Sequence, residues 1–159
     1  MESRYAHLLS PFQVGNVVFR NRMFTAPMGL HALQGGELYP TEAIITHYAN
    51  KAKGGAAVVT CSGTGAYPVT PDKDHLAYDL YIGHSQHYLA QLADAIHFYG
   101  AKASMEIQAA TREAGYYVSG GLMVPGPGMV PGQPTKELTK EMLADIKKNL
   151  QDQVKILKR

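Results

Sequence analysis

The sequence holds one cysteine, Cys61, among its 159 residues. A single cysteine excludes an internal disulfide, and it excludes a zinc or iron–sulfur site built from several cysteines of this chain. It fits a reducing compartment, so we expect a cytoplasmic protein. Long apolar runs are missing too, at the start of the chain and elsewhere. The sequence therefore predicts neither a signal peptide nor a membrane span.

Neither sign of charge is in large excess. The chain has 15 Lys and Arg against 13 Asp and Glu, and no basic run reaches the length of a nucleic-acid patch. His84 and His87 have a spacing near that of metal ligands, but they open a predicted helix without further ligands nearby, so we expect no metal site. A Gly-rich phosphate loop is absent as well. With 45% hydrophobic and 18% charged residues, the composition is that of a globular protein with a real core.

Short apolar segments alternate with helical patterns along the chain. Residues 8–20 predict two short strands joined by a tight turn at Gly15–Asn16. Thr41 is a predicted N-cap, and Gly54–Gly55 end the helix that it begins. Further strands are predicted at 22–28, 56–62 and 101–108, and further helices at 84–99 and from about 136 onward.

Each predicted helix carries an apolar stripe at helical spacing. The stripe positions are Ile44, Ile45, Tyr48, Ala49 and Ala52 in the first helix, Leu89, Leu92, Ile96 and Tyr99 in the second, and Leu138, Met142, Ile146, Leu150, Val154 and Leu157 in the third. The loops at 29–40, 63–83 and 109–135 are predicted to lack regular structure.

A hairpin followed by three strand–helix units predicts an α/β fold with a parallel sheet. Right-handed crossovers place the three strands side by side. Ligands of such sheets bind beyond the carboxyl ends of the strands. Those ends are Ala26–Gly29, Cys61–Gly65 and Gln108–Arg112, and long loops follow each of them, as is typical of functional loops.

The block "LLSPFQVGNVVFRNRMFTAPMG" resembles the opening of the old yellow enzyme family of NADH:flavin oxidoreductases, in the branch that contains 2,4-dienoyl-CoA reductase. "HYANKAKGGAAVVTCSG" and "AIHFYGAKASMEIQ" are similar to later blocks of that family, in the same order. The resemblance implies that residues 1–159 are the N-terminal part of an FMN-binding (β/α)8 TIM barrel, namely a bottom hairpin and three βα units. A whole barrel needs roughly 250 residues. We therefore expect self-association or a complementary barrel half.

The resemblance implies a role for the end of the first strand. In the family, the segment matching Phe24–Met28 is the first barrel strand, and the positions matching Ala26, Pro27, Met28 and Gly29 lie along the flavin ring. Proline gives up its N–H and glycine allows close approach of a flat ligand. Without the resemblance, the same residues describe an ordinary turn that ends a strand.

Two further cofactor positions follow from the resemblance. At Cys61, backbone atoms are implied to face the pyrimidine edge of the flavin, whereas the thiol itself has the pattern of a small buried hydrophobe. Gln108 matches a glutamine that hydrogen-bonds the pyrimidine carbonyl and ring nitrogen. The alternative for Gln108 is an amide satisfied by neighbouring loop backbone.

The chain departs from the family after Gln108. The run "QAATREAG" has Thr111 where histidine is usual, and its arginine comes early, at Arg112. We assign substrate contact to Arg112 and to His31, which follows the Pro-Met-Gly turn. A loop histidine such as His31 is otherwise simply solvated.

The resemblance implies an enzyme that uses FMN, reduced by NADH or NADPH, to reduce activated C=C bonds of small enone or enoyl substrates. The catalytic residues are not assigned within this chain, which would supply part of the flavin pocket. Two alternatives remain. The chain could be an inactive barrel fragment or assembly module, or its barrel could dehydrogenate amines or other carbon centres with flavin. Flavin binding with enone-dependent NAD(P)H oxidation would distinguish the first function from the others.

Overall fold

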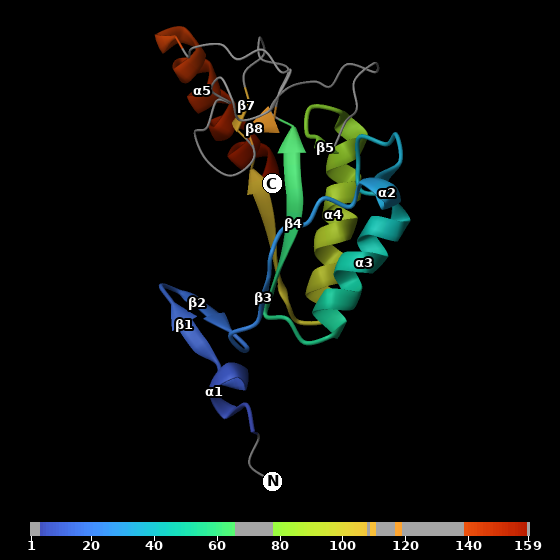
Figure 1. The fold of residues 1–159 in the computed structure, drawn as a ribbon, viewed down its shortest axis with the longest axis vertical. Coiled ribbons are helices and arrows are strands. Elements are labelled where there is room, and N and C mark those ends of the chain that lie inside the picture. Colours follow the sequence, from blue (N-terminus) through green and yellow to red (C-terminus); the bar gives the residue numbers. More distant parts are fainter. Residues whose placement is uncertain (1–3, 66–77, 108, 111–116, 119–138, 159) are drawn as a thin grey trace, which may run out of the picture.

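The computed structural model describes residues 4–65, 78–107, 109–110, 117–118 and 139–158. Three parallel strands form its centre, β3 (Phe24–Thr25), β4 (Val58–Gly65) and β6 (Lys102–Ile107) (Figure 1). Strand β4 lies in the middle and pairs in parallel with β3 on one edge and with β6 on the other. The predicted α/β class and the side-by-side order of the three strands are confirmed.

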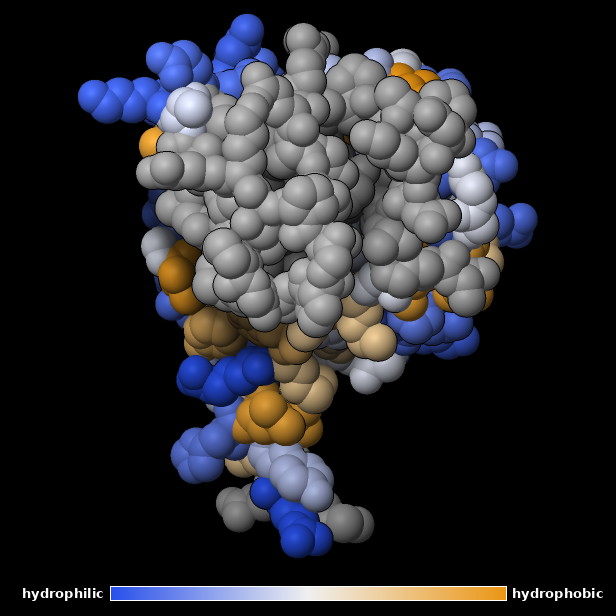
Figure 2. All heavy atoms as spheres, turned by 45° about the horizontal axis from the view of Figure 1, so that its top comes forward, coloured by the Kyte–Doolittle hydropathy of each residue, from blue (hydrophilic) through white to orange (hydrophobic). Residues whose placement is uncertain are grey.

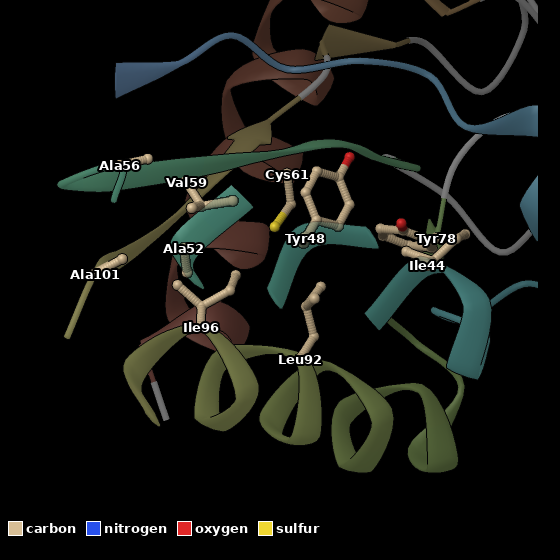
Figure 3. Close-up of a cluster of buried hydrophobic side chains, with 10 residues drawn as sticks. All are labelled: Ile44, Tyr48, Ala52, Ala56, Val59, Cys61, Tyr78, Leu92, Ile96 and Ala101. Carbon is tan, nitrogen blue, oxygen red and sulfur yellow. The ribbon is translucent and has the colours of Figure 1, made fainter. Parts of the chain in front are cut away.

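Helices α3 (Glu42–Lys53) and α4 (Gly83–Phe98) pack together against one face of the sheet (Figure 1). The core between them is a cluster of buried side chains from α3, β4 and α4 with a few neighbours (Figure 3). Val59 and Cys61 point into this core. Because side chains alternate along a strand, Thr60 and Ser62 belong to the opposite face, where both are partly exposed.

Helix α3 begins and ends where its sequence predicts. The Thr41 hydroxyl accepts a hydrogen bond from the Ile44 N–H at 3.3 Å and caps the first turn. Lys51 and Lys53 lie in the last turn, where a positive charge is favourable. Gly55 follows with φ of 104°, a conformation that other residues rarely adopt, and turns the chain into β4.

The predicted hairpin is formed by β1 (Phe12–Val14) and β2 (Val17–Phe19), which pair antiparallel through a turn with Gly15 at φ 56°. It lies at the amino end of β3, opposite the strand ends where a ligand is expected (Figure 1). The rings of Phe12, Phe19 and Phe24 pack together and join the hairpin to β3. Phe12 stacks on Phe19 and Phe24 with centroid separations of 5.1 and 5.9 Å, and the Phe19 and Phe24 rings are tilted at 5.2 Å. The prediction started the hairpin too early, because α1 (Ala6–Leu9) precedes it.

The Arg20 guanidinium connects three backbone segments at the base of the sheet. It donates hydrogen bonds to the carbonyl oxygens of Tyr99 at 2.5 Å, Ala52 at 2.8 Å and Ala56 at 2.7 Å. Two of these carbonyls belong to the C-terminal ends of α3 and α4, where a cation meets unpaired acceptors and the negative end of the helix dipole. Arg20 therefore fixes both helices relative to the start of β4.

Asn21 and Arg22 continue this network. The Asn21 side chain donates to the Gly55 carbonyl at 2.7 Å and accepts from the Met23 N–H at 3.0 Å. Arg22 donates to the His7 carbonyl at 3.1 Å, which ties α1 to the same base. The segment "RNR" thus serves as a bracket between the hairpin and the α3–β4 turn.

Strand β3 is shorter than predicted. The prediction extended it from Phe24 to Met28, but its ladder ends at Thr25. Pro27 has no N–H to donate, so a ladder through this position would lack one of its bonds. The loop before α3 and the loop after β4 also contain regular elements that the sequence did not predict. These are the short helix α2 (His31–Gln34) and strand β5 (Tyr78–Asp79), which pairs in parallel with the end of β4.

Helix α5 (Lys140–Leu157) forms, but its predicted stripe is only partly buried. Ile146 is buried, whereas Val154 is 49% exposed, and Asn149 and Gln153 are buried instead. The reason is that Val154 and Leu157 border a cavity of about 740 Å³ between α4, β6 and α5. Of the other stripe positions, Leu138 and the side chain of Met142 lie outside the described part of the chain.

The predicted loop at 109–135 is described only in two short pieces. Strands β7 (Ala109–Ala110) and β8 (Tyr117–Val118) pair antiparallel there, which the sequence did not predict. The rest of that loop lies outside the described residues. Within the described ranges, no helix combines the length and the apolar character that crossing a membrane requires.

Replacing Arg20 is expected to destabilise the fold. Arg20→Gln removes the charge and most of the guanidinium N–H donors. It should lower the free energy of unfolding by about 2 kcal/mol, because a hydrogen bond to a charged group contributes roughly that much. Urea unfolding followed by circular dichroism measures the loss. Arg22→Gln, which removes one such bond, is the matched control and should cost less. Equal losses in both variants would contradict the bracketing role of Arg20.

Candidate functional site

The predicted site lies at the carboxyl ends of β3 and β4, and the structure brings these ends together. Ala26 to Gly29 follow β3 and are exposed, with Met28 at 53%. The hydroxyl of Tyr48 donates to the Met28 carbonyl at 3.1 Å and accepts from the Ser62 N–H at 2.9 Å. One side chain of α3 therefore joins the stretch after β3 to the end of β4.

The edge of β4 that faces β3 changes partners along its length. Phe24–Thr25 pair with its first residues, and Tyr78–Asp79 pair with its last two. Between these pairs, the Thr60 N–H donates to the Thr25 hydroxyl at 3.1 Å and the Ser62 N–H to the Tyr48 hydroxyl. Two side-chain oxygens thus replace the backbone acceptors that β3 no longer supplies, and the backbone of 26–29 is released from the ladder.

Tyr48 is fully buried, and burial raises the pKa of its hydroxyl to about 12. The hydrogen bond from Ser62 lowers this pKa, while the nearby Cys61 and Glu106 raise it further. The phenol therefore stays protonated at neutral pH and can donate to Met28 while it accepts from Ser62. Figure 3 shows the ring rising from α3 with its oxygen at β4.

The Cys61 thiol points away from the candidate site, toward α4 (Figure 3). It is buried, and loss of solvation raises its pKa to about 12, against a smaller lowering effect of Lys51. A thiol in this state is neither a nucleophile nor a metal ligand at neutral pH. Cys61 packs as a small apolar residue, so only its backbone is available to the strand end.

Lys51 places a positive charge beside the exposed stretch. Its ammonium nitrogen lies 3.7 Å from the Met28 sulfur and 5.1 Å from the centre of the Tyr48 ring. The adjacent His47 has a ring nitrogen, Nε2, that is buried without a hydrogen-bond partner among the described residues. Burial, and secondarily Lys51, lower the pKa of His47. The lowered pKa favours the neutral form of the His47 ring beside the exposed stretch.

Three predicted site residues are not placed. Gln108 and Arg112 lie outside the described residues, and His31 begins α2 but its side chain is not described. Their roles remain predictions. His84 and His87 stand at the start of α4, where His87 Nε2 lies 3.0 Å from the Gln91 amide nitrogen. In the described ranges, no three His, Cys, Asp or Glu side chains gather as a metal site would require.

Sequence reasoning missed the importance of Tyr48, because it counted this residue as one member of an apolar stripe. Its burial was predicted correctly, but its hydrogen bonds were not. A signal was present, since a buried tyrosine hydroxyl usually requires a polar partner. Periodicity alone does not identify that partner.

Comparison with known proteins shows which class this fold and site define. Residues 7–155 match the NADH:flavin oxidoreductase / NADH oxidase family, and the chain belongs to this family. It is 27% identical to the NADPH dehydrogenase of Listeria monocytogenes serotype 4a (strain HCC23) over 149 residues, which are 89% of this chain and 43% of that enzyme. It is 34% identical to the metal reductase of Desulforamulus reducens (strain ATCC BAA-1160 / DSM 100696 / MI-1) over 148 residues, 87% of this chain and 21% of that protein.

Among solved structures, the old yellow enzyme from Trypanosoma cruzi superimposes with a TM-score of 0.56 at 20% identity, over 69% of this chain and 29% of that one. At this identity the likeness concerns the fold. The chain spans less than half the length of these relatives. The predicted resemblance to the old yellow enzyme family is confirmed.

The burial of Cys61 predicts slow reaction with thiol reagents. Because the thiolate is the reactive form, a pKa raised from 9.0 to about 12, together with the lack of access, should slow labelling by Ellman's reagent at pH 8 about 100-fold or more relative to the unfolded chain. The single cysteine makes the stoichiometry unambiguous, and labelling in urea gives the reference rate. Fast labelling of the native chain would show that the helix–sheet core is not closed at Cys61.

His47 predicts a loss of stability in mild acid. Its pKa in the folded chain lies below the ordinary 6.5, so the unfolded chain binds more protons as the pH falls below 6.5, and its contribution to stability is lost there. The free energy of unfolding of His47→Gln should therefore fall less between pH 7 and pH 5 than that of the parent chain. His97→Gln, on an exposed position of α4, is the control, and an equal change in both variants would show that His47 is not the source of the pH dependence.

Proposed function

We propose that residues 1–159 form one wall of an FMN site in a (β/α)8 barrel that reduces activated C=C bonds of small enone or enoyl substrates with NADH or NADPH. The family of the chain and its fold likeness to an old yellow enzyme support flavin chemistry. The single observation that carries the proposal is the exposed stretch Ala26–Gly29, released from the ladder at the carboxyl end of a parallel strand.

The described residues fit a flat aromatic cofactor at this place. Ala26 to Gly29 offer a short, exposed, largely apolar surface, in which Pro27 carries no N–H of its own. The core side chains of β4 point the other way, so a ligand at the strand ends would meet backbone at Cys61. When bound, FMN would supply hydride transfer between NAD(P)H and the substrate.

The roles of individual residues follow from this placement. Ala26–Gly29 would lie along the ring, the backbone at Cys61 would face its pyrimidine edge, and the Gln108 amide would hydrogen-bond the pyrimidine atoms. His31 and Arg112 would contact the substrate. The proton donor and the phosphate-binding groups are proposed to come from outside these residues, and the cytoplasm is the proposed location.

The exposed apolar side chains favour assembly with more protein. Figure 2 shows hydrophobic side chains, flanked by hydrophilic ones, on the lobe that projects from the body, which Figure 1 identifies as the hairpin region. Its exposed members include Leu8, Val14, Val17, Val18 and Phe24. Apolar surface of this kind usually marks a contact with another protein surface. We propose that a complementary barrel half, or a second copy of the chain, covers it.

The same exposure favours a second candidate, in which the chain is an assembly module or an inactive barrel fragment. On this alternative, the hairpin surface is the functional part and Ala26–Gly29 form only a turn. Flavin binding distinguishes the two.

The first test is the visible absorption spectrum of the purified chain, followed by titration with FMN monitored by flavin fluorescence. We expect a bound flavin, and with it NADPH oxidation that depends on an added enone once the barrel is complete. Gly29→Leu places a side chain on the proposed wall and should weaken FMN binding about tenfold or more, since it blocks close approach.

Gly36→Leu is the matched control, because an added side chain at Gly36 meets open space. Equal FMN affinity of Gly29→Leu and the parent chain would contradict the proposed contact between Ala26–Gly29 and the flavin ring. A chain that binds no FMN but forms a defined complex through its hairpin would support the assembly module instead.

A further inference from the structure

Strand β4 contains a bulge next to the candidate site. Between Cys61 and Thr64 the strand advances three residues, while its partner β6 advances two, from Met105 to Ile107. One residue of β4 is thus additional in this interval, in which Ser62 lies. Bulges of this kind redirect a strand and are frequent beside active sites.

The Tyr48 hydroxyl occupies the gap that this bulge and the early end of β3 leave between them. On one side it accepts the Ser62 N–H, which no β3 carbonyl is placed to receive. On the other side it donates to the Met28 carbonyl, three residues beyond the end of β3. A phenol can make both bonds at once, and full burial excludes water as a competitor.

The bond to Met28 has a consequence for the next residue. The described chain contains no cis peptide, and in a trans peptide the C=O and N–H of one unit point in opposite directions. Because the Met28 carbonyl points to Tyr48, the N–H of Gly29 must point away from it. That N–H lies on the exposed stretch and makes no hydrogen bond with the described residues.

We propose that Tyr48 is a positioning residue, whose hydroxyl fixes the Met28–Gly29 peptide and the end of β4 so that the Gly29 N–H is presented as a hydrogen-bond donor to the bound cofactor. The inference rests on the proposed function for the identity of that ligand. Tyr48 itself touches neither cofactor nor substrate and acts through two backbone groups. A donor held in one direction before binding costs less entropy than one that is ordered on binding.

The test compares Tyr48→Phe with Tyr78→Phe. Both tyrosines are buried in the same core, and both substitutions remove one hydroxyl. The hydroxyl of Tyr78 makes no hydrogen bond among the described residues, which makes Tyr78→Phe a control for loss of the polar atom alone. Four quantities are measured in each chain. They are the free energy of unfolding, the amide hydrogen exchange of Ser62 and Gly29, the amide chemical shifts of the same residues, and the affinity for added FMN.

In the parent chain, the Ser62 amide should exchange slowly. In Tyr48→Phe it should exchange about tenfold faster after correction for global stability, as the loss of one hydrogen bond predicts, and the Gly29 amide resonance should move. FMN affinity should fall about fivefold or more, and neither change should occur in Tyr78→Phe.

Unchanged FMN affinity in Tyr48→Phe, or fast exchange of Ser62 in the parent chain, would overturn the positioning role. If the parent chain binds no FMN, the proposed function fails for the isolated chain, and the amide measurements alone decide the inference. Shifts at Gly29 and Ser62 that are specific to Tyr48→Phe then support it, and their absence overturns it. If Tyr48→Phe does not fold, the Ser62 amide of the parent chain decides. Slow exchange then supports the positioning role, and fast exchange overturns it.

Discussion

The central strand must satisfy its backbone groups on both edges, and the rest of the structure depends on how it does so. Strand β6 pairs with β4 along nearly its whole length, so the backbone groups on that edge of β4 have hydrogen-bond partners. The other edge has β3 for only two residues. An unpaired amide in a buried strand costs free energy. The side-chain oxygens of Thr25 and Tyr48 accept hydrogen bonds from two such amides, and β5 pairs with β4 beyond them. The stretch at 26–29 is free for a ligand only because other residues have taken its place in the ladder.

The two ends of the sheet differ accordingly. At the base, Arg20 and Asn21 bind backbone carbonyls of both helix ends and of the α3–β4 turn, so the framework is joined by direct polar bonds. At the carboxyl ends, the side-chain oxygens of Thr25 and Tyr48 join the β3 side of the sheet to β4. Loops that bind ligands are usually positioned by a rigid scaffold, and the hydrogen bonds at the base supply such a scaffold here. The raised pKa of Tyr48, about 12, keeps its hydroxyl uncharged across the physiological range.

Much of the fold could be predicted because it depends on local pattern. Apolar periodicity predicted α3 and α4, and the Thr41 cap marked the start of α3. Continuous apolar runs between the helices predicted the order of the parallel strands. The length of β3 could not be predicted. Pro27 indicates that the ladder is interrupted, but it does not show which hydroxyl groups accept the β4 amides that β3 leaves unpaired. The buried Asn149 and Gln153 of α5 were missed for a similar reason. From sequence alone, a polar residue is predicted to be exposed, and only its tertiary surroundings show that it is buried. Of the candidate site, the exposed turn was found from its residues, whereas Tyr48 required the structure.

The chain exposes two surfaces of different chemistry, and they call for different partners. Around Ala26–Gly29 the exposed groups are backbone and small side chains at a strand end, which suit a flat molecule with hydrogen-bonding edges. Around the hairpin the exposed groups are valines and an aromatic ring, which suit another protein surface. Covering the second does not cover the first, because the hairpin and the strand ends lie at opposite ends of the sheet (Figure 1). Assembly can therefore complete the fold while the strand ends stay open to a ligand.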